Sequence, residues 1–364
     1  MSTLNPETAA YQTTTPQTVI GTWLYVEPKG AESRYPQVGG VSSSSTFQDV
    51  YWRCVMLFFA SSVRHNPSAI HRLFTTVPSV PDVGSFSTSD FLKRLNIEVV
   101  QVPFTYLPPP GYHGAWRNQF YILDIIKSLD VRGAKDEQYL ILDCDCVFTA
   151  AIDDLSRHLS QKGLLALDLG LPLDEDINGL TQRDMKRIFE EIGQPCPEEA
   201  TKYYGGEFFA ATSEVIHQLA SEIEPLWETC LARFRAGQPK FNEEAHFLSF
   251  LYAKLGYTGG TANRYIGRIW TGLKFRNTSP RDFDLAIWHI PAEKKHGIKR
   301  LYPQVINPDS VFWTIPPGHE FARYIAGYMG IPKSSLVKKL RDLYDTVLWR
   351  VVGKAARKKE SPMS

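Results

Sequence analysis

The sequence predicts an α/β fold: a mostly parallel sheet flanked by helices, followed by a C-terminal helical appendage. Two observations predict it. Short apolar segments of strand length alternate with amphipathic segments of helix length along most of the chain, which is typical of repeated βα units. The 364 residues, of which 43% are hydrophobic and 22% charged, can build a sizeable core, which excludes a disordered or collagen-like protein.

The first half of the chain contributes an arm and the first βα units. Residues 1–46 are rich in Thr, Ser, Pro and Gly, and they predict an extended N-terminal arm with one short strand over 20–26. The nearly continuous apolar run at 53–60 predicts a buried strand, and the polar residues 61–67 predict the loop that follows it. We then expect a helix, a strand over 72–76, a helix from Ser89, a strand over 97–102 and a helix over 116–129.

The second half continues the same alternation and ends in a separate segment. We expect strands over 138–142, 164–167, 207–211 and 285–289, and helices over 213–236 and 243–255. The economical division of the chain is the arm over 1–46, one α/β domain over 47–300, and a C-terminal segment over 301–364.

The C-terminal segment concentrates the positive charge of the chain. The whole sequence has 40 basic and 39 acidic residues, a balance that argues against non-specific nucleic-acid binding. Within 333–359, apolar residues fall largely on one stripe of a helix, and basic residues fall mainly elsewhere. This basic amphipathic pattern predicts either a helix that lies on an anionic membrane surface or a helix that packs against the domain.

We expect a cytoplasmic protein, and its tail adds the alternative of peripheral membrane association. The sequence has no run of about 18 uncharged apolar residues, and residues 1–18 lack the layout of a signal peptide. The odd number of cysteines, five, is typical of reduced thiols in a reducing compartment.

The most specific feature is the tripeptide Asp143-Cys144-Asp145, which directly follows the apolar strand expected at 138–142. In an open α/β sheet, ligands bind just beyond the carboxyl ends of the strands. Two carboxylates at that place suit a divalent cation, which would also bind a diphosphate. The alternative is that the aspartates only begin a turn, since Asp is a common turn residue. Cys144 and Cys146 are interpreted as buried thiols, because no matching pair of Cys or His ligands lies nearby.

Four segments, taken in order, carry a resemblance to a known family. They are Tyr139 to Phe148 with the two aspartates, Tyr204-Gly205-Gly206-Glu207, Asn242-Glu243-Glu244-Ala245-His246, and Ile287-Trp288-His289 with Lys294-Lys295-His296-Gly297 downstream. Together they resemble the sugar-nucleotide-dependent glycosyltransferases of the GT-A fold, and they are most similar to the family of glycogenin and the bacterial lipopolysaccharide galactosyl- and glucosyltransferases. The resemblance covers about 55–300. The sequence departs from the family pattern where glutamates replace a Gln and an Asp, and where the Gly-Gly segment lacks an Asn.

The resemblance implies a GT-A-like catalytic domain with a metal-assisted donor site. Asp143 and Asp145, with His289 as a third ligand, would hold Mn²⁺ or Mg²⁺ on the donor diphosphate. A core histidine is the structural alternative for His289, and surface side chains are the alternative for the basic residues. The other residues that the resemblance places at the donor are Ser61 and Asn66 in the loop after the first strand, Arg117 before the metal strand, and Lys294 and Lys295 in a phosphate loop.

Glu243 and Glu244 are the candidate catalytic residues, with Glu207 in reserve. They open a helix, where acidic residues also simply complement the helix dipole. In an inverting reaction one of them would be the general base that deprotonates the acceptor hydroxyl. In a retaining reaction it would stabilise positive charge at the anomeric carbon. The sequence leaves both open.

We therefore expect a metal-dependent glycosyltransferase that moves a hexose from a nucleoside-diphosphate sugar, most simply a UDP-sugar, to a hydroxyl. The acceptor would be a lipid-linked or surface glycan, and no nucleic acid would be a partner. A haloacid-dehalogenase-like phosphohydrolase would use Asp143 as its nucleophile, but its motif normally opens the domain. A sugar nucleotidyltransferase shares the broad fold, but the segment 61–67 lacks the glycines of its phosphate loop. The intact Asp-x-Asp disfavours an inactive carbohydrate-binding relative.

Overall fold

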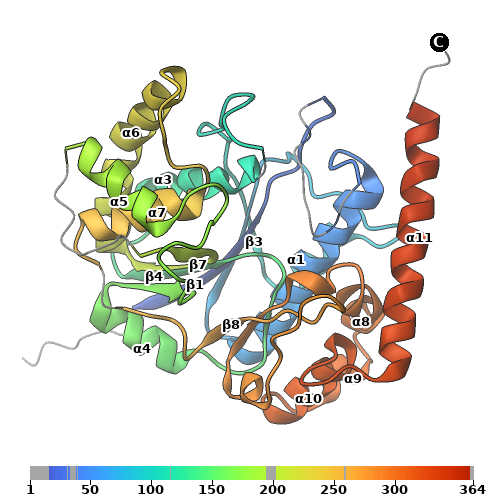
Figure 1. The fold of residues 1–364 in the computed structure, drawn as a ribbon. Helices are drawn as coiled ribbons and strands as arrows, with labels where there is room; N and C mark the ends of the chain where they lie inside the picture. The colour runs from blue at the N-terminus through green and yellow to red at the C-terminus, as the bar shows by residue number, and fades with distance from the viewer. Residues whose placement is uncertain are drawn as a thin grey trace, which may run out of the picture.

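The computed structural model describes residues 16–30, 32, 38, 40–114, 116–193, 202–257 and 260–360, with residues 350–360 described by their backbone alone. Its centre is a six-stranded sheet (Figure 1). Along the sheet the strands are β3 (Glu98–Gln101), β2 (Ile70–Thr75), β1 (Gln17–Leu24), β4 (Glu137–Leu142), β7 (Tyr204–Thr212) and β6 (Leu164–Asp168). The pairs from β3 to β4 are parallel, and β7 runs antiparallel to both β4 and β6. The mostly parallel α/β sheet is confirmed.

Alternate residues of each strand face two different cores. Leu140 and Leu142 of β4 belong to one core, while Tyr139 and Ile141 belong to the other, as the two-residue period of a strand requires. Because both faces are covered, the strand reads as a continuous apolar run in the sequence. The helices that contribute to the first core are α1 (Ser45–His65), α2 (Thr88–Arg94), α4 (Asp153–Lys162), α8 (Gly297–Ile306), α9 (Val311–Thr314) and α10 (His319–Met329). Those of the second core are α3 (Tyr121–Arg132), α5 (Gln182–Glu191), α6 (Ser213–Arg235) and α7 (Glu244–Lys254).

A second, three-stranded sheet adjoins the central one and brings late residues back to the end of β4. Its order is β5 (Cys146–Phe148), β9 (Ile287–His289) and β8 (Ile266–Arg268). The antiparallel register places Cys146 opposite His289, and the amide of Ile290 donates to the carbonyl of Asp145. The functional site therefore depends on this small sheet.

The run at 53–60 was predicted as a strand, and that prediction is wrong, because it lies inside helix α1. The helix packs on β1, β5 and α8, so it is apolar on nearly all sides and shows no clear helical period. Residues 61–65 complete the same helix and are not a loop after a strand. The first strand is β1, which lies between β2 and β4, so the short strand expected over 20–26 within the arm is a central strand of the sheet.

The helix expected between 67 and 72 is wrong, because the chain turns there and enters β2. The other predicted elements match the structure within a few residues: strands β2, β3, β4, β6, β7 and β9, and helices α2, α3, α6 and α7. Strands β5 and β8 and helices α4, α5, α8, α9 and α10 were not predicted. The expected division at residue 300 falls within α8, and Leu301, Phe312 and Phe321 belong to the same core as α1. Cys54, Cys144, Cys146 and Cys230 are buried free thiols, while Cys196 lies outside the described residues.

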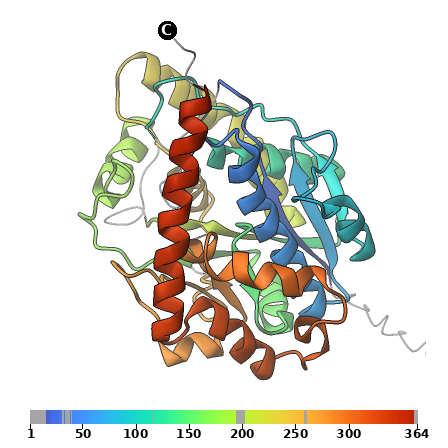
Figure 2. The same ribbon diagram turned by 90° about the vertical axis from the view of Figure 1, so that its right-hand side faces the viewer.

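The predicted C-terminal helix is α11 (Leu336–Glu360), which runs along one side of the molecule (Figure 2). Within the described part of the chain, none of the helices combines the length and apolar character that crossing a membrane requires.

Gly21 tests how tightly β1 is packed within the sheet. A Cβ at this position would lie 2.8 Å from Cδ1 of Ile141 and 2.9 Å from Cε2 of Phe74. Because these two side chains occupy the space that the new methyl group needs, we expect Gly21→Ala to lower the free energy of unfolding by about 1–3 kcal/mol. Urea denaturation measures the change, and Gly114→Ala, with open space around its Cβ, is the control. Equal unfolding midpoints for the two variants would contradict this packing.

Candidate functional site

A cleft opens at the carboxyl ends of β1 and β4, and it contains the two aspartates. It contains about 1120 Å³ of empty space, a volume that includes the solvent at its open mouth. Its floor and walls come from several regions of the chain. They are the end of β1 and the residues after it (Trp23, Leu24, Tyr25, Val26, Glu27), Ser42 with the start of α1 (Phe47, Gln48, Tyr51), residues Trp116, Asn118 and Gln119, the turn after β4 (Asp143, Cys144, Asp145), Asn178, Tyr203 with β7 and the start of α7 (Gly206, Glu207, Glu243, Glu244), and the segment from Arg268 to Lys294 (Arg268, Trp270, His289, Pro291, Lys294).

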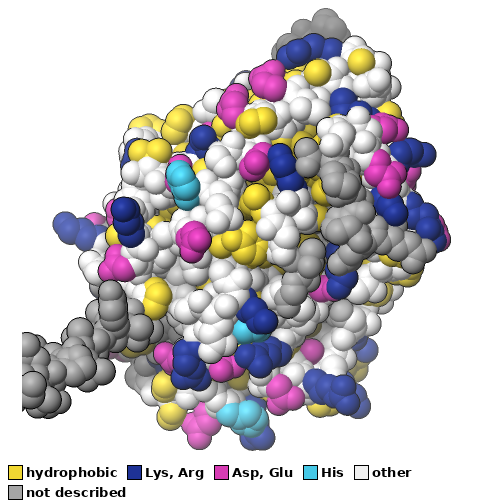
Figure 3. Space-filling view, turned by 90° about the vertical axis from the view of Figure 1, so that its left-hand side faces the viewer, with side chains coloured by type: hydrophobic (Ala, Val, Ile, Leu, Met, Phe, Trp, Pro, Cys, Tyr) yellow, Lys and Arg dark blue, Asp and Glu magenta, His cyan; other side chains and the backbone are white. Residues whose placement is uncertain are grey.

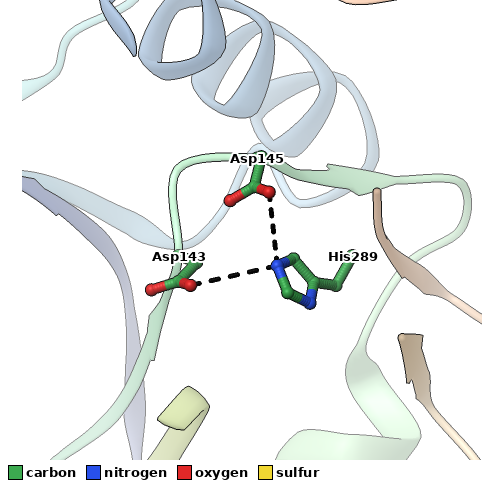
Figure 4. Close-up of side chains that lie close together, drawn as sticks. All are labelled: Asp143, Asp145 and His289. Atoms are coloured by element: carbon green, nitrogen blue, oxygen red, sulfur yellow. Dashed lines mark ion pairs between the residues drawn. The ribbon is translucent and has the colours of Figure 1, made fainter. Parts of the chain in front are cut away.

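Asp143, Asp145 and His289 come together in this cleft (Figure 4). Nε2 of His289 lies 3.3 Å from Asp145 Oδ2 and 3.9 Å from Asp143 Oδ2, and one potential ligand atom of each residue lies within 4.8 Å of the others. Two carboxylates and one imidazole nitrogen form a donor set that fits a divalent cation such as Mn²⁺ or Mg²⁺. A core histidine without a polar role does not describe His289.

Glu207 orients this histidine. Its Oε1 lies 3.2 Å from Nδ1 of His289, and the guanidinium of Arg268 forms two hydrogen bonds to the same carboxylate. With Nδ1 donating to Glu207, Nε2 faces the two aspartates, as in many histidine metal ligands. Burial alone would raise the pKa of Glu207, but Arg268 and His289 hold it below its usual value. A carboxylate that is paired with Arg268 and holds His289 in place is a positioning group, so Glu207 is poorly suited to act as a general base.

The protonation states of the three residues depend on one another. Burial raises the pKa of Asp143 to about 7, and the neighbouring charge of Asp145 adds to the shift. Burial acts in the same direction on Asp145, but Lys294 and His289 hold the pKa of that carboxyl below its usual range. Burial acts to lower the pKa of His289, yet Asp145 and Glu207 raise it to about 9.

Lys294 and Lys295 point to different places. The ammonium of Lys294 is buried in the cleft and donates to Asp145, so it lies where a phosphate group bound at the aspartates would be neutralised. Lys295 donates to the carbonyl of Val38 at 2.8 Å and does not line the cleft. Only the first of the two predicted phosphate lysines is therefore placed for that role.

Glu243 and Glu244 also face the cleft. Glu243 accepts hydrogen bonds from Tyr203, at 2.8 Å, and from Asn178, and burial raises its pKa to about 7. Oε2 of Glu244 is buried and has no hydrogen-bond partner among the described residues, and burial raises the pKa of Glu244 well above its usual value. A Cβ at residue 206 would lie 2.0 Å from Oε1 of Glu244, so the close approach of this carboxyl requires Gly206.

These contacts bear on the two interpretations of the glutamates. The two residues begin α7, but the side chain of Glu243, the N-cap residue, makes no capping hydrogen bond to the helix. The side chains are instead buried in the cleft, where ionisable groups with raised pKa values are typical of active sites.

Besides Lys295, three of the predicted donor residues lie outside the cleft. Ser61 accepts from the amide of Phe148, and Asn66 accepts from the amide of Ile152, so both fasten α1 to neighbouring segments. Both were misplaced because residues 61–65 belong to α1. Arg117 donates to the carbonyl of Pro108 at 2.6 and 3.1 Å and serves the loop before α3.

The sequence analysis missed the aromatic wall of the cleft. Trp23 and Tyr25 lie at the end of β1, and Trp116 and Trp270 come from loops. Assigning the strand expected over 20–26 to the central sheet would have identified the first two. Asn118, which follows Arg117, lines the cleft with a buried carbonyl oxygen that has no partner among the described residues.

The comparisons with known proteins give similarity at the level of solved structures. No protein-family model and no curated protein matches the sequence. An active-site mutant of LgtC, a bacterial lipopolysaccharide galactosyltransferase, matches with 12% identity and a TM-score of 0.44, over 75% of this chain and 86% of that chain. Mouse xyloside xylosyltransferase 1 in its apo form matches with 10% identity and a TM-score of 0.43, over 75% of this chain and 96% of that chain. Both are GT-A glycosyltransferases.

The pKa values predict how metal binding changes with pH. A cation at the aspartates requires a neutral His289 and an ionised Asp143, whose pKa values are raised to about 9 and about 7. We therefore expect the affinity for Mn²⁺ to increase from about pH 6 to about pH 9, with release of protons, in calorimetric titrations. Asp145→Ala should abolish binding, and Asp174→Ala, at an exposed carboxylate, should not. An affinity independent of pH would contradict the assignment.

Proposed function

We propose that this chain is a metal-dependent glycosyltransferase that transfers a hexose from a nucleoside-diphosphate sugar to a hydroxyl group. The observation that carries the proposal is the cluster of Asp143, Asp145 and His289 in a cleft at the carboxyl ends of the central strands. Two acids and a histidine at that place suit a cation bound to a diphosphate, and the buried Glu243 and Glu244 lie in the same cleft. On the family resemblance, we propose uridine as the base of the donor and a lipid-linked or surface glycan as the acceptor.

Each group of side chains has a role in this reaction. The bound Mn²⁺ or Mg²⁺ would offset the negative charge that develops on the leaving diphosphate. Lys294 adds a fixed positive charge beside Asp145, and Glu207 holds the ring of His289 in place. The aromatic wall formed by Trp23, Tyr25, Trp116 and Trp270 offers flat apolar surface to a base or a sugar ring.

Glu243 is the better placed of the two candidate catalytic glutamates. With a pKa of about 7 it is partly ionised near neutral pH, which suits a general base. Its orientation is held by Tyr203 and Asn178. Burial and the charges of Glu243 and Asp143 raise the pKa of Glu244 well above its usual value, and its protonated form would suit a hydrogen-bond donor to the sugar. A general base at Glu243 corresponds to an inverting reaction, whereas in a retaining reaction the same carboxylate would stabilise positive charge at the anomeric carbon.

The phosphohydrolase alternative needs Asp143 as an ionised nucleophile and Asp145 as a proton donor, and the second requirement is not met. Its general acid, Asp145, would have to carry a proton, yet Lys294 holds the pKa of that carboxyl low. The segment 61–65 belongs to α1, so its lack of glycines no longer bears on the sugar nucleotidyltransferase alternative.

Hydrolysis of a panel of nucleoside-diphosphate sugars tests the proposal. We expect slow release of one nucleoside diphosphate with Mn²⁺ or Mg²⁺ and none with EDTA, since water can replace an absent acceptor. Asp145→Ala should lower the rate on the order of 10³-fold, and Asp174→Ala should leave it unchanged. Release of inorganic phosphate from simple phosphate esters, with no turnover of any sugar nucleotide, would favour a phosphohydrolase.

Glutamine substitutions separate catalysis from stability at the two glutamates. We expect Glu243→Gln to lower turnover about 10²- to 10⁴-fold, because the amide cannot accept a proton. Because the pKa of Glu244 is raised in the folded protein, the wild type should lose stability between about pH 5 and about pH 8, whereas the amide of Glu244→Gln does not titrate. The unfolding temperature of Glu244→Gln, compared with that of the wild type, should therefore be more favourable at about pH 8 than at about pH 5. Thermal unfolding and turnover of both variants are compared with Glu228→Gln, at an exposed position on α6. Full activity of Glu243→Gln would rule out its role as a base.

A further inference from the structure

Helix α11 turns an apolar side away from the protein. Leu336, Leu340, Leu343 and Val347 follow one another at helical spacing, so they form one stripe. Seven of the thirteen exposed large apolar side chains among the described residues lie on this helix, each between 41% and 72% exposed: Leu336, Val337, Leu340, Leu343, Tyr344, Val347 and Leu348. Figure 2 shows the helix lying across this side of the molecule, with no other element in front of it. We call these seven side chains the α11 stripe.

The polar side of α11 is the side that contacts the body. Lys338 is buried and donates to Glu293 at 2.9 and 3.1 Å and to Asp342 at 2.7 Å. Arg300 of α8 donates to Asp342 at 2.7 Å and to Asp345 at 2.9 Å. Because Lys338, Asp342 and Asp345 follow at i, i+4 and i+7, they share the face opposite the α11 stripe. The helix is therefore attached through ion pairs, and its orientation is the reverse of an ordinary surface helix.

Such a stripe needs a covering surface. A contiguous apolar patch on a monomer usually marks a contact with a protein or a membrane. On α11 the stripe continues from Leu336 to Leu348 without a charged residue within it. Packing against the domain, one of the two interpretations of the sequence, accounts for the polar side and leaves the apolar side unexplained.

The charges around the stripe favour an anionic partner. Lys339 and Arg341 are exposed, and helical geometry places them on opposite edges of the stripe. The acidic residues of 336–349, Asp342 and Asp345, are held by Arg300 on the inner side. The sequence of 350–360 adds five basic residues and one acidic residue. The opposite side of the molecule, by contrast, shows basic and acidic side chains interspersed (Figure 3).

We propose that α11 binds an anionic lipid bilayer, with its stripe in the interface and its polar side still attached to the body. Apolar side chains flanked by lysine and arginine are the pattern of helices that lie on such membranes. A second copy of this chain would bring two basic helices together, so charge repulsion disfavours it. Lipid binding uses no side chain of the cleft, so its test does not depend on the proposed transferase activity.

The contact between α11 and the body also determines how the cleft would lie relative to the membrane. Trp349 of α11 packs against the cluster formed by Val38, Phe47 and Val50. Phe47 itself lines the cleft, so a membrane along α11 would lie beside the cleft wall formed by the start of α1. An acceptor carried in the bilayer would meet the protein on that side.

Vesicle co-sedimentation of the full chain tests the proposal. We expect binding to vesicles of phosphatidylcholine with phosphatidylserine and much weaker binding to phosphatidylcholine alone, with a loss of affinity at high salt. Leu343→Glu should lower the affinity about tenfold or more, because it places a charge in the α11 stripe, which the bilayer would bury. Val131→Glu makes the same change of charge at an exposed apolar residue of α3 and should have little effect. The double variant Lys339→Gln, Arg341→Gln should lower affinity about 25-fold, about fivefold for each charge.

Three results would overturn the proposal. They are no binding of the wild type to the phosphatidylserine vesicles, equal binding by Leu343→Glu and Val131→Glu, or a wild-type dimer in analytical ultracentrifugation that Leu343→Glu dissociates. The last result would make the stripe an interface between copies of the chain. Circular dichroism checks that each variant is folded, and the high exposure of both substituted apolar residues favours that outcome.

Discussion

The antiparallel pairing of β5 with β9 is the contact on which the candidate site depends. It places Cys146 opposite His289 and ties the amide of Ile290 to the carbonyl of Asp145. On the other side of the turn, the amide of Asp143 donates to the carbonyl of Glu207 at the start of β7. The two aspartates are therefore held between two strands, and their carboxylates meet a histidine that lies far along the chain.

This arrangement gathers more negative than positive charge in a buried place. Six carboxylates line the cleft, and the cationic side chains that line it are Arg268, His289 and Lys294. A buried surplus of negative charge is costly unless protons or a cation compensate it. Burial raises the pKa values of Asp143, Glu243 and Glu244, which shows that protons can supply part of this compensation. A divalent cation between Asp143, Asp145 and His289 would supply it where a diphosphate must bind.

The sequence allowed the two aspartates of the candidate metal site to be predicted, because two carboxylates after an apolar strand have no role in core packing. Helix α1 could not be recognised, since a helix buried on most sides has the apolar pattern of a strand, and the error moved Ser61 and Asn66 into a loop. The pairing of Glu207 with Arg268 depends on β8, a strand of three residues that carries no clear pattern. The C-terminal helix was predicted from its amphipathic pattern, but the pattern does not say which side faces the protein.

The most direct test of the account is the binding of uridine diphosphate with and without Mn²⁺, measured by calorimetry on the wild type and on His289→Ala. If the cation at Asp143, Asp145 and His289 carries the diphosphate, the nucleotide will bind the wild type only when Mn²⁺ is present, and His289→Ala will lose most of that affinity. Equal nucleotide affinity with and without Mn²⁺, or an unchanged affinity in His289→Ala, would contradict the account.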